Sequence, residues 1–191
     1  MMLYNQPMGR VSSYRYLGVT ICNDLSWSLH IDKIASKTRQ LIGMLYRRFY
    51  KWSSPNALLQ LYLSLIRPLL EYSVQVWSPY LLKDIQKLEA VQKFAWRDGI
   101  LATVSYSMQV VYQSSHTDCR EVLSLTFFYK AVYGQVTLPD DIIVPHVCNH
   151  NTRSSSGATY IQLFARTNTY HHSFFASTIS LSYFCFVSAI F

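Results

Sequence analysis

Acidic residues are scarce in this chain, and charged residues of either sign are few. There are 10 Asp and Glu against 17 Lys and Arg, so the 191 residues carry a net charge of +7 and only 14% of them are charged. Half of the residues are hydrophobic, which excludes a disordered polar chain and provides enough apolar side chains for a packed core. The excess of positive charge favours polyanionic partners, nucleic acid before an anionic membrane.

Cysteine is also sparse and shows no pairing pattern. The chain has 4 cysteines, Cys22, Cys119, Cys148 and Cys185, and no CxxC pair. This spacing excludes a dense disulfide framework and indicates free thiols in a reducing compartment. The first residues lack the basic segment and apolar run of a signal peptide. We therefore expect an intracellular protein that is not secreted, in the nucleus or the cytoplasm.

The common catalytic motifs are missing. The sequence contains no Gly-rich phosphate loop, no GxSxG and no HExxH, which argues against hydrolases and nucleotide-binding enzymes and gives no small-molecule substrate. His146, Cys148 and His150 alternate as ligands on a strand would, but no fourth ligand follows at a typical spacing, so a polar loop is predicted and no metal site. Asp140 and Asp141 follow a Leu-Pro loop and are interpreted as solvated.

The positive charge is concentrated in the first quarter of the chain. Between residues 10 and 51 there are eight basic residues and two acidic ones, so this segment carries +6 of the total +7. A field of this kind predicts a nucleic-acid-binding surface, and the alternative is a basic, solvated helix face. The basic residues are Arg10, Arg15, Lys33, Lys37, Arg39, Arg47, Arg48 and Lys51.

Hydrophobic periodicity predicts a short β element followed by a long helix. Residues 1–24 are rich in β-forming side chains and are interrupted at Gly18, which predicts a hairpin with a bend there. Asp24 or Ser26 is a candidate cap for the helix that follows. From Trp27 to Phe49 apolar residues recur at steps of three and four, and the basic residues lie mainly off that stripe.

Further helices follow, joined by short connections. Ser54 and Pro55 predict the start of a second helix, which Pro68 should kink or split. A third helix covers about residues 81–95, and a fourth runs from about residue 119 to a stop at Gly134. Short connections favour antiparallel neighbours in a bundle.

The end of the chain is apolar. Residues 174–191 contain no charged side chain, and this length lies at the lower limit of a membrane span. Several serines and a threonine dilute the apolar stretch, so a core segment is predicted and a membrane anchor is the alternative. Altogether we expect a mainly α protein, with a β element at 1–24, a helical bundle at 25–135 and an irregular, apolar tail at 136–191.

Five segments between residues 14 and 97 resemble, in the same order, the region that follows the palm in reverse transcriptases of LINE-type (non-LTR) retrotransposons, which are RNA-directed DNA polymerases. The segments are YRYLGVTI with DLSWSLHI, LYRRF, LYLSLIRPLLEY with VWSP, KDI, and LEAVQKFA. A later block, from Arg153 to Ile179, resembles the far C-terminal tail of the same elements.

The resemblance implies a thumb-like bundle that clamps a template–primer duplex. It implies that Tyr16, Leu17 and Gly18 form a turn beside the primer strand, and that the following helix faces the phosphate backbone. The partners are then RNA, DNA or an RNA–DNA hybrid, bound without sequence preference. The basic residues given this role are Lys33, Lys37, Arg39, Arg47 and Arg48. Apart from the resemblance, Tyr46, Tyr50 and Trp52 lie beside Arg47, Arg48 and Lys51 and are a candidate cluster for base stacking, with a place in the core as the alternative.

The resemblance also implies that this chain alone is not an enzyme. The family's paired catalytic aspartates would lie upstream of Met1, and the Mg²⁺ that the intact enzyme uses would bind there, so no cofactor is expected here. Residues 98–115 and those after Leu181 depart from the family pattern. Two alternatives therefore stay open: a non-functional translated remnant, and an interaction or tail-anchored protein that uses the apolar C-terminus.

Overall fold

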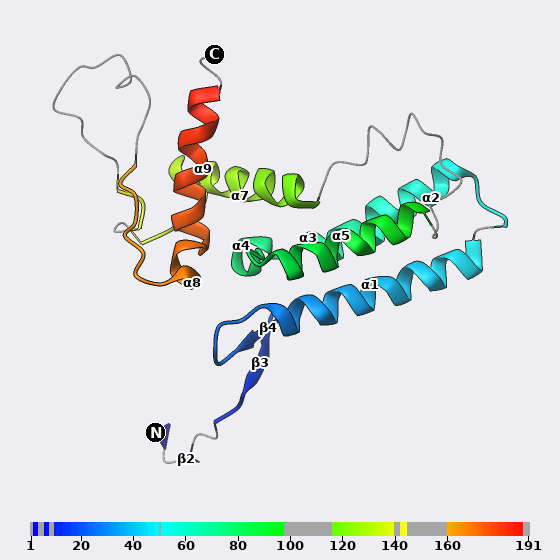
Figure 1. Ribbon diagram of the computed structural model, residues 1–191, viewed down its shortest axis with the longest axis horizontal. Coiled ribbons are helices and arrows are strands. Elements are labelled where there is room, and N and C mark those ends of the chain that lie inside the picture. The colour runs from blue at the N-terminus through cyan, green and yellow to red at the C-terminus, as the bar shows by residue number, and fades with distance from the viewer. Residues whose placement is uncertain are drawn as a thin grey trace. The chain divides into compact units, whose positions relative to one another are not determined.

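The computed structural model describes residues 2–3, 6–7, 10–49, 51–97, 116–139, 142–144 and 160–188 (Figure 1). The predicted fold class is confirmed: 64% of these residues are helical, and an antiparallel hairpin precedes the helices. The chain divides into two compact units. The first contains Met1–Ser73 and Leu81–His116, and the second contains Val74–Tyr80 and Thr117–Phe191. The fourth predicted helix therefore groups with the C-terminal residues.

Two short antiparallel ladders open the first unit. β1 (Met2–Leu3) pairs with β2 (Gln6–Pro7), and β3 (Ser13–Tyr16) pairs with β4 (Val19–Cys22). The second pair is joined by a two-residue turn in which Leu17 has φ 46° and Gly18 has φ 89°. Positive φ at both central positions defines a type I′ turn, whose twist matches that of the strands. The bend predicted at Gly18 is confirmed.

Helix α1 (Ser28–Phe49) is the long amphipathic helix that the periodicity predicts. The predicted cap is wrong: the Asp24 carboxylate accepts a hydrogen bond from the Ser26 N–H at 3.0 Å and closes a turn before the helix begins. The stripe itself is confirmed, because its buried residues recur at the steps of three and four that a helix face requires. They are Ile31, Ala35, Thr38, Ile42 and Leu45, with His30 beside them.

The second predicted helix is divided as Pro68 requires. α2 (Pro55–Leu61) begins after Ser54, whose hydroxyl accepts from the Ala57 N–H at 3.3 Å, as predicted. A π-helical turn, η1 (Tyr62–Ile66), separates it from α3 (Arg67–Glu71). Pro68 lies in the first turn of α3, where its missing N–H leaves no hydrogen bond unmade.

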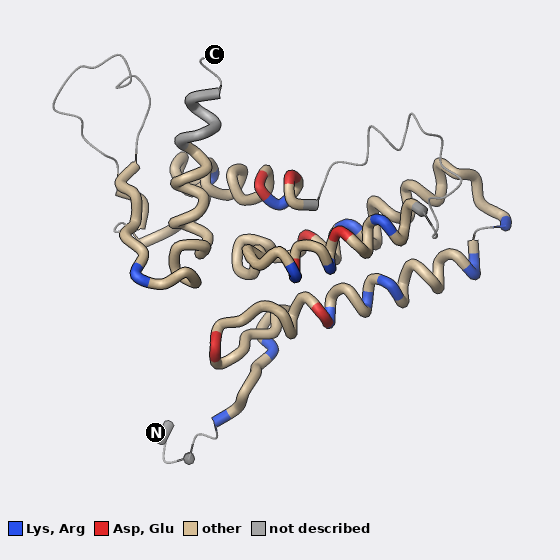
Figure 2. Tube along the Cα trace, in the orientation of Figure 1, with Lys and Arg blue, Asp and Glu red and all other residues tan. Residues whose placement is uncertain are grey.

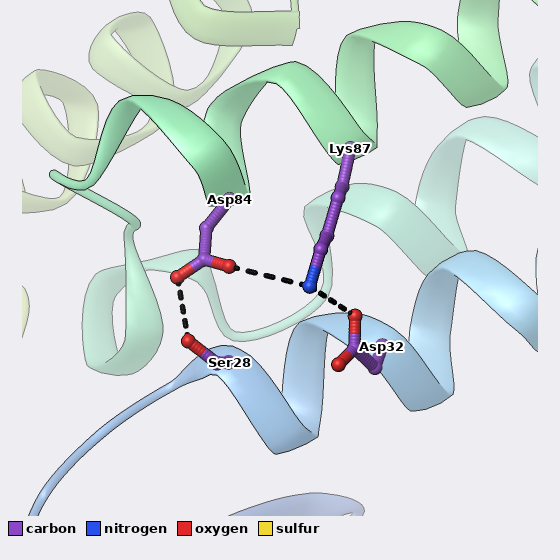
Figure 3. A network of polar contacts seen from close by, with 4 residues as sticks. All are labelled: Ser28, Asp32, Asp84 and Lys87. Atoms are coloured by element: carbon purple, nitrogen blue, oxygen red, sulfur yellow. Dashed lines mark hydrogen bonds and ion pairs between the residues drawn. The ribbon is translucent and has the colours of Figure 1, made fainter.

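Helix α5 (Leu82–Arg97) packs along α1. Leu88, Val91 and Ala95 of this helix are buried, and Leu81 precedes the helix and is exposed. A polar network links the first turns of α5 to α1 (Figure 3). The Ser28 hydroxyl donates to Asp84 at 2.8 Å, and Lys87 lies 3.8 Å from Asp84 and 2.6 Å from Asp32.

The second unit contains α4 (Val74–Trp77), α7 (His116–Val132), α8 (Asn168–His171) and α9 (Phe174–Ser188). α7 ends as predicted, with Gly134 at φ 69° after it. The apolar tail, expected to be irregular, forms α9, and the Phe174 ring meets Phe127 of α7 edge-on at 5.4 Å. Within the described part of the chain, no helix is both long and apolar enough to cross a membrane.

Candidate nucleic-acid interface

A pocket of about 520 Å³ lies where the β3–β4 hairpin, α1 and the end of α3 meet in the first unit. The hairpin contributes one residue from each strand and the glycine of its turn. Helix α1 contributes its flank beside the buried stripe, and the segment around the end of α3 supplies two large side chains. The lining residues are Arg15, Gly18, Thr20, His30, Lys33, Ile34, Lys37, Thr38, Leu69 and Tyr72.

Tyr72 and the hairpin turn hold one wall of this pocket in place. The Tyr72 hydroxyl donates a hydrogen bond to the Leu17 carbonyl oxygen at 3.1 Å, across 55 positions of sequence. A Cβ atom added at Gly18 would lie 3.5 Å from the edge of the Tyr72 ring, and its φ of +89° is one that other residues rarely adopt. Glycine is therefore required by the turn, whereas the distance to the ring would leave room for a Cβ atom.

Three cations line the pocket. Arg15 comes from β3, and Lys33 and Lys37 come from consecutive turns of α1. The Lys33 ammonium donates to the Thr20 hydroxyl at 3.3 Å, which orients it along the hairpin. No ion pair among the described residues involves any of these cations. Their charge is therefore available to an anion in the pocket.

His30 is a buried residue of the pocket whose pKa is lowered by burial and by the neighbouring cations. It is 3% exposed, and its Nδ1 accepts a hydrogen bond from the Thr20 N–H at 3.2 Å. A neutral ring that accepts at Nδ1 carries its proton on Nε2. Burial first, and then the charges of Lys33 and Arg15, lower the pKa of His30 from 6.5 to about 4. The imidazole is neutral at physiological pH and adds no charge to the pocket.

This depressed pKa makes the stability of the first unit sensitive to acid. The unfolded chain protonates this histidine near pH 6.5, and the folded chain does so only near pH 4. The free energy of unfolding should therefore fall as pH drops through this window, by about 2 kcal/mol after allowance for solvent screening. Urea unfolding of the native chain and of His30→Gln at several pH values measures this, because the variant shares all the other titrating groups. Equal pH dependence of the two chains would contradict the assignment.

Helix geometry separates the predicted site residues on α1 into two directions. Successive residues turn by about 100°, so Lys33 and Lys37 differ by about 40°, Arg48 lies about 20° from Lys37, and Arg47 lies about 80° from it at the edge of this face. Arg39 follows Lys37 by two residues and points about 160° away from it. We call Lys33, Lys37, Arg47 and Arg48 the basic face of α1; Figure 2 shows cationic positions from the first turns of this helix to its end.

The remaining predicted residues lie outside the pocket. Tyr16 and Leu17 are exposed beside it on the hairpin, and Lys51 is exposed after the end of α1. In the predicted stacking cluster, Trp52 is 89% exposed and Tyr46 is partly exposed, while Tyr50 lies outside the described residues. The structure therefore brings together Gly18, Lys33 and Lys37 from the predicted set.

Seven pocket residues were not among the predicted site residues: Arg15, Thr20, His30, Ile34, Thr38, Leu69 and Tyr72. Arg15, Thr20 and His30 belong to the segment whose resemblance covers the hairpin and the start of α1, and Tyr72 ends another of the matching segments. A sequence signal exists for His30, because it precedes Lys33 by three residues and Lys37 by seven, which is the spacing of one helix face. Tyr72 has no such signal, since only the folded chain, in which α3 packs against α1, brings it to the pocket.

Comparisons with protein-family models, curated proteins and solved structures give no match. The candidate metal ligands His146, Cys148 and His150, and the pair Asp140 and Asp141, lie outside the described residues. Among the residues that the structure describes, no three His, Cys, Asp or Glu side chains are grouped as metal ligands would be.

Proposed function

We propose that this chain is a non-catalytic, thumb-like part of a LINE-type reverse transcriptase that binds the sugar–phosphate backbone of RNA, DNA or an RNA–DNA hybrid. The observation that carries the proposal is the pocket lined by Arg15, Lys33 and Lys37 without a neutralising carboxylate among the described residues. Phosphate oxygens are the anions that such clusters of Lys and Arg bind most often in nucleic-acid-binding proteins.

The basic face of α1 extends the positive charge beyond the pocket. Arg47 lies fourteen residues after Lys33, which places it about 21 Å farther along the helix axis and about 40° around it. Gln40 and Met44 lie between the two charged ends on the same side. Two separated groups of cations suit phosphates of a long polyanion better than a single small anion.

The resemblance of residues 14–97 to the post-palm region of LINE-type reverse transcriptases supports the same reading. The positions that it assigns to the primer-side turn are Tyr16, Leu17 and Gly18, and this turn closes one side of the pocket. A backbone-level contact of this kind positions a strand and does not read its sequence.

The proposal predicts salt-dependent binding that depends on the direction of each cation on α1. Fluorescence anisotropy of a labelled RNA–DNA hybrid, titrated with the full chain at several salt concentrations, measures the affinity and its salt slope. Changing Lys33, Lys37, Arg47 and Arg48 together to Ala should weaken binding about 100-fold and reduce the slope by about 4, one for each lost phosphate contact. Hybrids of unrelated sequence should bind alike.

Arg39→Ala is the matched control, because it removes one exposed cation from the same helix on another side. It should change the affinity by less than about twofold, whereas Lys37→Ala alone should weaken it several-fold. A folded chain that does not bind the hybrid would contradict the proposal and leave the translated-remnant or interaction-protein alternatives. Equal losses for Arg39→Ala and Lys37→Ala would contradict the assignment of the binding side.

A further inference from the structure

The pocket has two sides of different chemistry. Arg15, Lys33 and Lys37 supply positive charge, and Ile34, Leu69 and Tyr72 supply an apolar and aromatic wall. Its volume of about 520 Å³ lies within the range of pockets that enclose small organic ligands. A bare phosphate would use only the cationic side and would leave the wall in contact with water.

We infer that the pocket binds one unpaired nucleotide unit, with its phosphate on the cations and its base against the Tyr72 wall. This inference rests on the proposed function and deepens it, since it adds a ring-binding position to the phosphate contacts. The ligand is a nucleoside phosphate, either free in solution or at the end of a nucleic-acid strand.

Tyr72 is suited to this role because its ring is both accessible and held. The residue is 56% exposed, and the hydrogen bond from its hydroxyl to the Leu17 carbonyl fixes the far end of the side chain. A ring already held in one orientation loses little conformational freedom when a base stacks on it. Stacking of a base on an aromatic side chain strengthens binding by about tenfold or more.

The two threonines of the pocket already make hydrogen bonds within the protein. The Thr20 hydroxyl accepts a hydrogen bond from the Lys33 ammonium, and the Thr20 backbone N–H donates one to His30 Nδ1. The Thr38 hydroxyl donates to the Ile34 carbonyl oxygen at 2.8 Å. Base edges are told apart by hydrogen bonds from such groups, and every base has a face that stacks. The pocket should therefore accept all bases with similar affinity.

Calorimetric titration of the full chain with inorganic phosphate, adenosine and adenosine monophosphate tests the inference. Adenosine monophosphate should bind at least about tenfold more tightly than phosphate, and adenosine alone should bind weakest. Tyr72→Leu should reduce the monophosphate affinity to that of phosphate, and Tyr72→Phe should keep part of the gain, because it keeps the ring but loses the hydrogen bond that holds it. Lys37→Ala should weaken both anions, and Arg39→Ala neither.

Binding of a linear 5′-phosphorylated strand, compared with that of a closed circle of the same sequence, shows whether the nucleotide in the pocket is free or belongs to the end of a strand. Tighter binding of the linear strand identifies a strand end, and a linear strand that competes for the pocket no better than adenosine monophosphate identifies a free nucleoside phosphate. The inference is overturned if the monophosphate binds no better than phosphate, or if its advantage survives in Tyr72→Leu. If salt-dependent hybrid binding persists in that case, only the nucleotide pocket is lost; if it is absent as well, the proposed function also fails.

Discussion

Replacing Ile42 with aspartate is expected to lower the free energy of unfolding of the first unit by about 4 kcal/mol or more. Ile42 is 0% exposed and lies in the middle of the buried stripe of α1. An aspartate there either buries an unpaired carboxylate or takes up a proton, and both cost free energy in addition to the lost apolar burial. Urea unfolding followed by far-ultraviolet circular dichroism measures the loss.

Two substitutions serve as controls for this prediction. Ile42→Val removes one buried methylene and should cost about 1 kcal/mol. Gln40→Asp introduces the same carboxylate two residues away at an exposed position of the same helix, and should change stability by about 0.5 kcal/mol or less. If Ile42→Asp were as stable as Gln40→Asp, α1 would not pack through this stripe, and the orientation of the basic face would be wrong.

Replacing Asp84 with alanine should lower the free energy of unfolding by about 3 kcal/mol. Asp84 is 2% exposed, and its carboxylate accepts the hydrogen bond of the Ser28 hydroxyl at 2.8 Å. Alanine leaves that half-buried hydroxyl without its acceptor and opens a small cavity between α1 and α5. It also removes the carboxylate that lies 3.8 Å from the Lys87 ammonium (Figure 3).

The neighbouring ion pair provides the contrast. Lys87 and Asp32 approach to 2.6 Å, but their side chains are 39% and 54% exposed, so Asp32→Ala should cost less than about 1 kcal/mol. A double-mutant cycle between Ser28→Ala and Asp84→Ala should give a coupling of about 1 kcal/mol. Equal losses for Asp32→Ala and Asp84→Ala would show that the buried carboxylate does not join the two helices.

Local sequence patterns predict the elements of the first unit well. The stripe of α1 follows from steps of three and four, the cap of α2 from Ser54 and Pro55, and the turn from Gly18, because each depends on residues close together in the chain. The cap predicted for α1 is wrong because the Asp24 carboxylate accepts a hydrogen bond from the Ser26 N–H instead. This bond joins residues as close in sequence as a helix cap does, so the local pattern does not distinguish the two.

Features that depend on distant segments could not be predicted in this way. The burial of Asp84 arises from the packing of α5 against α1, which no local pattern encodes. The candidate site could be predicted only in part. Spacing alone separates Lys37 from Arg39 on the helix, whereas the meeting of Lys37 with Tyr72 requires the folded bundle.

The bond from Tyr72 to Leu17 joins segments that are 55 positions apart, so the pocket exists only in the folded chain. Any ligand of the pocket therefore binds the native state and not the unfolded one, and mass action makes it a stabiliser. A ligand present at about 100 times its dissociation constant would add about 2.7 kcal/mol to the free energy of unfolding. Removal of such a ligand would favour the unfolded state.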